Sequence, residues 1–397
     1  MSENRAPIYL DNNATTRTDP SVVQTMLPFF TEQFGNASSA HAFGNEAAIA
    51  VRQARRSLSG LLGSAYDHEI VFTSGGTEAN NAAILSALAT QEGRDEVVTT
   101  SVEHSAVLAL TEQLAARGVK TRIIAVDACG RLDIEAFRCA LGPRTAIASV
   151  MWANNETGTI FPVKCLAGWT REAGALFHTD AVQAIGKVRL NLKDSTIDML
   201  SLSAHKLHGP KGVGALYLRK GTKFQPLICG GSQERGRRAG TENTPGIVGL
   251  GKAAELAAER LEPERIRIGA LRDRLEQGIL RNGECVVLGD IRNRLANTTN
   301  IAFDHLEGEA IAHRLNRAGI AVSLGSACRS GSMSGSMQPS HVLRAMQVPA
   351  WRMHGAVRFS LSRETSLAEV DEAVCAVSDI VTRMRASSRA TVREQTS

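Results

Sequence analysis

The chain contains the stretch Phe177-His178-Thr179-Asp180-Ala181-Val182-Gln183, followed by Ser201-Leu202-Ser203-Ala204-His205-Lys206. Each begins as a short apolar or β-branched run and ends in polar residues, which is typical of a strand that gives way to a turn. Similar runs recur along the chain with helical stretches between them. This alternation predicts an α/β fold with a mainly parallel sheet that is covered by helices on both faces. The expected strands are residues 70–73, 96–100, 120–124, 145–151, 176–179, 199–203 and 214–218.

The ends of these two strands carry an acidic residue, Asp180, and a lysine, Lys206. Ligands of parallel sheets collect at the carboxyl ends of the strands. A lysine and an aspartate placed there suit a pyridoxal phosphate site. We expect Lys206 to form a Schiff base with the cofactor aldehyde, and Asp180 to keep the pyridine nitrogen protonated, which makes the ring an electron sink. The sequence therefore predicts an enzyme that stabilises carbanions beside an amino group.

A glycine-rich turn, Thr73-Ser74-Gly75-Gly76-Thr77-Glu78, follows one expected strand and opens a helix. Backbone N–H groups at a helix N-terminus bind phosphate well, and the Thr77 hydroxyl adds a donor. The alternative is a plain strand-to-helix turn. Because Ser203 and His205 occur later in the chain at a second strand end, we favour a phosphate site that includes Gly76 and Thr77.

Three further residues are candidates for the same site. His104 follows a strand, where it could stack on a cofactor ring and accept protons; the alternative is a surface histidine. Asn155 could donate a hydrogen bond to the cofactor's phenolic oxygen or to a substrate carboxylate; the alternative is a turn-forming asparagine. Arg358 lies within a strand, and its guanidinium fork suits an α-carboxylate; the alternative is a structural ion pair.

Cys328 lies within a run of Gly and Ser residues at 322–331. Such a loop packs no core, whereas a structural cysteine has apolar neighbours, as Cys285 does. Cys328 is therefore the candidate nucleophilic thiol. Seven cysteines without CxxC pairs do not predict a disulfide framework or a structural zinc site. We expect packing or incidental roles for Cys129, Cys139, Cys165, Cys229, Cys285 and Cys375.

The composition is that of a water-soluble enzyme. Of the 397 residues, 43% are hydrophobic and 21% are charged, and the formal net charge is +5. This charge does not require a nucleic acid partner, and we expect the cluster at Arg235–Arg238 to contact a phosphate or a subunit. The sequence shows neither a signal peptide nor an apolar stretch long enough to span a membrane. The expected compartment is the cytoplasm.

The pattern changes after about residue 251. A charged helical stretch at 253–281 is expected to link two domains, with short strands at 300–303, 320–323 and 356–360 and a closing helix from residue 366. We predict a large cofactor-binding domain at 16–262 and a smaller α+β domain formed by 1–15 and 263–385, which carries the Cys328 loop. The polar residues 386–397 are expected to be disordered.

These motifs resemble the cysteine desulfurases, which are fold-type-I pyridoxal phosphate enzymes, and among them the NifS type. The NifS type is indicated by Arg237-Arg238-Ala239-Gly240-Thr241-Glu242-Asn243 and by Val357-Arg358-Phe359-Ser360-Leu361-Ser362-Arg363. The resemblance implies a homodimer in which Thr241 reaches the phosphate of the neighbouring subunit's cofactor. It also implies cofactor contacts from Gln183 and Ala204. The resembling stretches are residues 9–16, 151–158, 178–186, 203–214, 233–243, 322–331 and 354–363.

The same resemblance implies the reaction. L-cysteine gives L-alanine and a persulfide on Cys328, which passes sulfur to an iron–sulfur scaffold protein for cluster assembly, in particular for nitrogenase maturation. Cys328 is also a candidate transient iron–sulfur ligand. Leu324 and Arg329 depart from the family loop, and a Ser-Gly-Ser-Met repeat at 334–337 lengthens it. Two alternatives stay open: a selenocysteine lyase or another enzyme of this scaffold, including an aminotransferase, and a non-catalytic sulfur-transfer protein.

Overall fold

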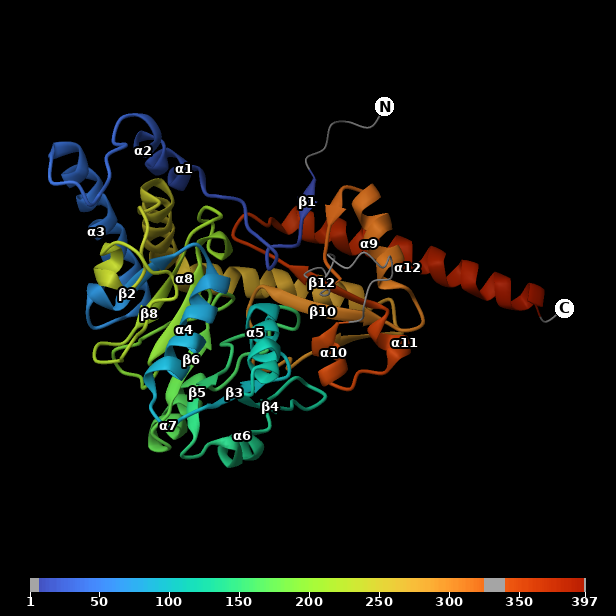
Figure 1. Cartoon of the computed structure of the whole chain (residues 1–397). Helices are drawn as coiled ribbons and strands as arrows, with labels where there is room; N and C mark the ends of the chain where they lie inside the picture. Colours follow the sequence, from blue (N-terminus) through green and yellow to red (C-terminus); the bar gives the residue numbers. More distant parts are fainter. Residues whose placement is uncertain (1–6, 325–339, 396–397) are drawn as a thin grey trace.

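The computed structural model describes residues 7–324 and 340–395, and a seven-stranded sheet is its centre (Figure 1). Strand β8 is antiparallel to β2 and β7, whereas all the other pairs are parallel. The predicted α/β fold with a mainly parallel sheet is therefore confirmed. In spatial order the strands are β2 (Ile70–Thr73), β8 (Gly214–Leu218), β7 (Met199–Ser203), β6 (Leu176–Asp180), β5 (Thr145–Ser149), β3 (Glu96–Thr100) and β4 (Lys120–Ile124).

Helices cover both faces of this sheet because successive side chains of a strand point to opposite sides. Val71 packs with the buried residues of α4 (Gly76–Thr90) and α5 (Ser105–Ala116), whereas Ile70 and Phe72 pack with those of other helices. The helices on that second side include α3 (Ala42–Leu62), α7 (Val163–Glu172) and the first half of α8 (Thr244–Leu280). The remaining helices of this region are α1 (Pro20–Met26), α2 (Pro28–Thr31) and α6 (Ile134–Ala140).

A second, smaller core lies around an antiparallel sheet in the order β12-β10-β9 and a parallel pair, β1-β11. Apolar residues three or four positions apart on α12 face this core, as do those of the second half of α8. The elements are β1 (Ile8–Tyr9), β9 (Cys285–Leu288), β10 (Thr298–Phe303), α9 (Gly308–Arg317), β11 (Ile320–Ala321), α10 (His341–Ala345), α11 (Ala350–Met353), β12 (Ala356–Ser360) and α12 (Leu367–Gln395).

Helix α8 connects the two cores, as expected for the charged stretch at 253–281. Leu250 and Ala254 belong to the core of the large sheet, and Leu271 and Leu275 belong to the small core. The helix continues through Pro263. The domain boundaries at residues 16 and 262 remain predictions.

The expected disorder from residue 386 is wrong as far as Gln395, because α12 extends to that residue. The residues after 385 are polar, but Ala, Arg, Glu and Gln all have high helix propensity. Adding residues to a helix that has already formed is easier than nucleating one. The composition therefore excludes a packed core for this segment but does not exclude a helix.

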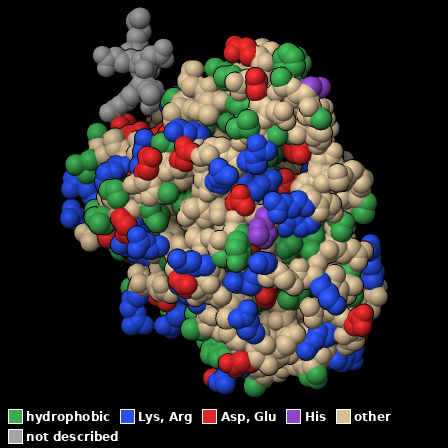
Figure 2. Space-filling model, turned by 90° about the vertical axis from the view of Figure 1, so that its left-hand side faces the viewer, with side chains coloured by type: hydrophobic (Ala, Val, Ile, Leu, Met, Phe, Trp, Pro, Cys, Tyr) green, Lys and Arg blue, Asp and Glu red, His purple; other side chains and the backbone are tan. Residues whose placement is uncertain are grey.

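Basic and acidic side chains are interspersed over the face that Figure 2 presents. The arginines of the Arg235–Arg238 cluster differ in their surroundings. Arg238 donates to Glu78 at 2.9 Å, and Arg237 donates to a backbone carbonyl, whereas Arg235 is exposed. Among the described residues, none of the helices is long and apolar enough to cross a membrane.

Candidate active site

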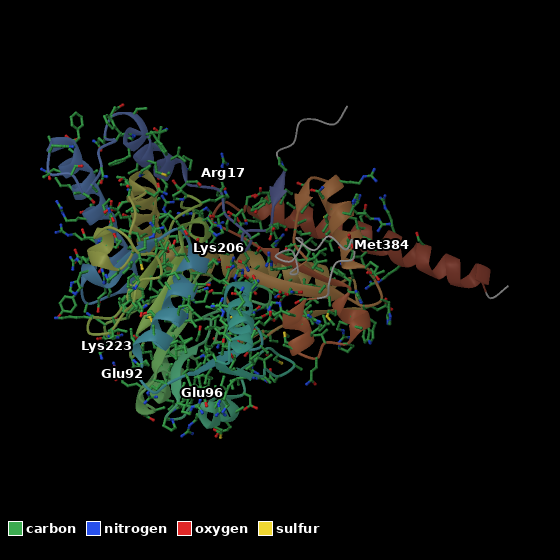
Figure 3. The ribbon with its side chains drawn as sticks, in the orientation of Figure 1. Arg17, Glu92, Glu96, Lys206, Lys223 and Met384 are labelled. Atoms are coloured by element: carbon green, nitrogen blue, oxygen red, sulfur yellow. The ribbon has the colours of Figure 1, made fainter. Side chains whose placement is uncertain are left out.

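A cavity of about 350 Å³ lies at the carboxyl ends of the large sheet's strands. Lys206 lies near the middle of the molecule, between this sheet and the strands of the small core (Figure 3). The cavity is lined by Asn13, Ala14, Gly76, Thr77, Asn80, His104, Met151, Ala153, Asn155, Asp180, Val182, Gln183, Ser203, His205, Lys206 and Arg358. The structure therefore brings together most of the site residues that the sequence predicts.

Asp180 is the last residue of β6, and two donors hold its carboxylate. Asn80 Nδ2 donates to Oδ2 at 2.7 Å, and the backbone N–H of Val182 donates to Oδ1 at 2.9 Å. Asp180 is only 6% exposed, so these bonds offset the loss of water around its charge. Sequence reasoning missed Asn80, although it lies one helical turn after Gly76 on α4 and therefore on the same face.

Lys206 ends a short 3-10 turn, Ala204–Lys206, that follows β7. Its Nζ donates to the backbone carbonyl of Asn13 at 2.5 Å and to that of Ala14 at 2.7 Å. Both carbonyls are acceptors, so they fix the direction in which the lysine amine points. This turn places the lysine amine and the Asp180 carboxylate around the same cavity.

Gly76 and Thr77 form the first turn of α4, as expected. Within the part of the chain that the structure describes, this end of the helix has no side-chain cap, and its N–H groups suit an anion. A Cβ added at Gly76 would lie 2.6 Å from Val182 Cγ2, which explains the glycine. Burial lowers the pKa of His205 to about 4, and the positive charge of Lys206 acts in the same direction. His205 is therefore neutral at pH 7 and can still donate one hydrogen bond.

His104 caps helix α5, and its Nδ1 accepts a hydrogen bond from the backbone N–H of Ala106 at 3.1 Å. Burial lowers the pKa of His104, so the neutral imidazole prevails at pH 7. Because Nδ1 is an acceptor, the proton of the neutral ring lies on Nε2, which then has no lone pair. In this tautomer His104 has a hydrogen-bond donor at Nε2, and the proton-acceptor role expected for it stays a prediction.

Glu103, next to His104, is fully buried beneath the site. Its Oε1 accepts from Thr100 Oγ1 at 2.7 Å and from the backbone N–H of Met151 at 2.9 Å. Its Oε2 has no hydrogen-bond partner among the described residues. Burial raises the pKa of Glu103 to about 8, and the negative charge of Asp180 contributes in the same direction. Glu103 is therefore a neutral carboxylic acid at pH 7.

Arg358 lies on β12 and reaches the cavity, but its guanidinium already has partners. Nη2 donates to Asp11 Oδ1 at 2.6 Å, and Nη1 donates to the backbone carbonyl of Asn155 at 2.9 Å. The structural ion pair considered as an alternative is thus present. It does not exclude substrate binding, because a guanidinium has five N–H donors and Nε is buried without a partner among the described residues.

Asn13 joins the two cores at the site, and sequence reasoning assigned it no role. Its Nδ2 donates to Asn155 O at 3.1 Å and to Thr298 Oγ1 at 2.9 Å. Its backbone carbonyl accepts from Gln183 Nε2 at 2.9 Å and from Lys206. In the sequence, the only feature that pointed to Asn13 was its place in the stretch 9–16. Its hydrogen bonds could not be predicted, because they join segments that are far apart in the chain.

Two predicted cofactor contacts do not reach this cavity. The side chain of Ala204 is fully buried, which leaves only its backbone for a ligand. Thr241 is exposed and lines a separate depression with Arg238 and Asn243. Cys328 lies outside the described residues, and so does the inserted repeat at 334–337.

The six described cysteines are free, and four of them are exposed, which excludes a packing role for those four. The exposed ones are Cys139, Cys165, Cys229 and Cys375. Groups of three or more residues that could hold a metal ion are absent from the described residues. The iron–sulfur ligand role suggested for Cys328 therefore stays a prediction.

The residues present fit pyridoxal phosphate. The cavity has the volume of an ordinary small-molecule site. It combines the amine of Lys206, a carboxylate at a strand end, and a helix N-terminus beside Thr77 and Ser203. These groups match the aldehyde, the ring nitrogen and the phosphate of the cofactor, respectively.

The fold and this site define a class of protein. The chain belongs to the class-V aminotransferase family, whose model matches residues 8–373. This family and its solved structures confirm the expected fold.

Within this family, the chain is similar to proteins named as cysteine desulfurases. The chain is 99% identical over 397 residues to the cysteine desulfurase of Bradyrhizobium diazoefficiens, with all of both chains covered. It is 56% identical over 381 residues to the cysteine desulfurase NifS of Azotobacter vinelandii, covering 96% of this chain and 94% of that protein. A solved structure titled NifS-like protein has a TM-score of 0.88 at 37% identity, covering 95% of this chain and 99% of that one.

Proposed function

We propose that this protein is a pyridoxal phosphate-dependent cysteine desulfurase of the NifS type. It removes sulfur from L-cysteine, releases L-alanine and retains the sulfur as a persulfide on Cys328. The observation that carries the proposal is the shared cavity of Lys206 and Asp180 in a chain whose named relatives are cysteine desulfurases.

Lys206 would attach the cofactor through its amine, Asp180 would hold the proton of the ring nitrogen, and Gly76, Thr77 and Ser203 would hold the phosphate. When bound, pyridoxal phosphate supplies an aldehyde and an electron-withdrawing ring. The bonds from Asn80 and Val182 fix the position of the Asp180 carboxylate.

The substrate is held and deprotonated by neighbouring groups. The remaining N–H donors of Arg358 and the side-chain amide of Asn155 bind the α-carboxylate. After its release, the Lys206 amine accepts the α-proton, and the carbonyls of Asn13 and Ala14 then stabilise the resulting ammonium. His104 donates a hydrogen bond from Nε2 into the same space.

The sulfur transfer balances as follows. The Cys328 thiolate attacks the sulfur of the substrate, an S–S bond forms and the C–S bond breaks. The electron pair of the C–S bond remains with the β-carbon, which takes up a proton to become the methyl group. The Lys206 ammonium returns a proton to the α-carbon, which completes alanine. The nucleophile is a thiolate because a protonated thiol attacks poorly.

We further propose a cytoplasmic homodimer. Thr241 is exposed and lies away from its own subunit's cavity, as a contribution to the neighbouring subunit's phosphate site would require. The persulfide of Cys328 passes to an iron–sulfur scaffold protein, in particular for nitrogenase maturation. The name NifS of the Azotobacter vinelandii relative supports this last role.

The direct test uses the visible absorbance of the purified protein and its turnover of cysteine. The native protein should show the band of lysine-linked pyridoxal phosphate, and Lys206→Ala should lose both this band and alanine formation. A Lys206→Ala protein that retained both would contradict the assignment. Turnover of selenocysteine but not of cysteine would favour the selenocysteine lyase alternative instead.

A further inference from the structure

A second, smaller cavity lies on the other side of Lys206. Its volume is about 50 Å³, and Lys206 and Lys187 both line it, together with Glu264 and Arg363. Lys187 is absent from the lining of the larger cavity, and the proposed reaction gives it no task. Its Nζ nevertheless donates to Gln183 Oε1 at 3.0 Å, and Gln183 does line the larger cavity.

The two partners of Gln183 leave its amide a single orientation. The backbone carbonyl of Asn13 can only accept, so the amide nitrogen must face it, at 2.9 Å. With the amide nitrogen fixed in this way, the amide oxygen faces Lys187, whose amine donates to it. With Oε1 turned toward Lys187, the group that Gln183 can offer to the larger cavity is the second N–H of Nε2.

We propose that Lys187 is a positioning residue, which orients the Gln183 amide so that it presents an N–H donor to an anionic oxygen of the bound cofactor. The inference rests on the pyridoxal phosphate site proposed above. Without the Lys187 amine, the Gln183 amide would lose one of its two anchors. The donor would then point into the cavity for a smaller part of the time.

The surroundings of Lys187 are consistent with this role. Burial lowers the pKa of Lys187 to about 7, and the positive charges of Lys206 and Arg358 contribute. A neutral amine keeps N–H donors, so the bond to Gln183 survives deprotonation. A second acceptor, Asn13 Oδ1, lies 3.5 Å from Nζ, so the amine faces two oxygens of the same cluster.

The test is a double-mutant cycle on cofactor affinity. Apo protein is titrated with pyridoxal phosphate and the dissociation constant is read from the visible absorbance, for wild type, Lys187→Met, Gln183→Ala and the double variant. We expect Lys187→Met to weaken binding roughly tenfold, the size of one hydrogen bond to a charged group, but to have little effect in the Gln183→Ala background. Lys193→Met, a change at an exposed lysine six residues away, is the matched control.

An equal loss of affinity in both backgrounds would overturn the proposal, because Lys187 would then act through its charge or through Asn13. No loss in the wild-type background would overturn it as well. Gln183→Glu tests the same point with Lys187 intact, since a carboxylate offers no N–H, and its affinity should fall about as far as that of Lys187→Met. Failure of the wild-type protein to bind pyridoxal phosphate would refute the proposed function itself, which separates the two conclusions.

Discussion

Glu103→Gln tests whether the buried carboxyl group of Glu103 is protonated in the folded protein. The substitution keeps the Oε1 acceptor for Thr100 and Met151 and replaces the unpartnered Oε2 with an amide group. The pKa of Glu103 is raised to about 8 from an ordinary value of 4.5. Between these two values the folded protein keeps the proton, whereas the unfolded chain releases it. The stability that Glu103 contributes is therefore full below about pH 4.5 and is lost as the pH rises through about 8.

The expected size follows from about 1.4 kcal/mol per pKa unit. Between pH 6 and pH 8, wild type should lose about 2 kcal/mol of unfolding free energy relative to Glu103→Gln. The measurement is urea denaturation of the apo proteins, followed by circular dichroism at several pH values. Other titrating groups are common to both proteins, so they cancel in the difference.

Glu276→Gln is the control. Burial alone would raise the pKa of Glu276, but hydrogen bonds from Arg294 and Thr299 lower it below the ordinary value. Glu276→Gln should be less stable than wild type by an amount that does not change between pH 6 and pH 8. The pKa of Glu276 lies below this range in both the folded and the unfolded protein, so its carboxyl group does not titrate there. If the wild-type and Glu103→Gln curves ran parallel over this range, Glu103 would be ionised and the reasoning refuted.

Three further predictions concern the cofactor, the substrate and the sulfur. Gly76→Ala should weaken pyridoxal phosphate binding at least tenfold in an absorbance titration, because its Cβ would lie 2.6 Å from Val182 Cγ2. The control Gly60→Ala has open space around its Cβ and should leave the affinity unchanged. Arg358→Lys should raise KM for cysteine roughly tenfold or more with a smaller change in kcat, because an ammonium lacks the guanidinium fork. The control is Arg352→Lys, at an arginine that pairs with Asp304. If Arg358→Lys and wild type had equal KM values, Arg358 would not bind the substrate. Cys328→Ala should keep the cofactor absorbance and its spectral change with cysteine but release no sulfur; full desulfurase activity would move the nucleophile to another cysteine.

Much of the fold was predictable because strand periodicity and strand ends are local signals. Strands β6 and β7 were recognisable from their apolar runs, and Asp180 and Lys206 stood out because each follows such a run. Since parallel strands end at one edge of a sheet, their proximity followed from topology alone.

The supporting residues could not be predicted in the same way. Asn13 forms hydrogen bonds with residues far away in the chain. Lys187 acts through the Gln183 amide, whose orientation depends on both of its hydrogen-bond partners. The Nδ1 of His104 caps a helix, a role that depends on where α5 begins. Thr241 lies outside its own subunit's cavity, and its expected contact with the neighbouring subunit's cofactor stays a prediction.

Lys206 and Cys328 together are proposed to move sulfur from cysteine to the protein. The most direct measurement is intact-protein and peptide mass spectrometry after incubation with one equivalent of L-cysteine, with alanine measured in the same sample. We expect alanine formation and a mass increase of one sulfur atom on the peptide containing Cys328, and we expect both to be absent in Lys206→Ala. Alanine formed without sulfur on that peptide, or sulfur found on another cysteine, would contradict it.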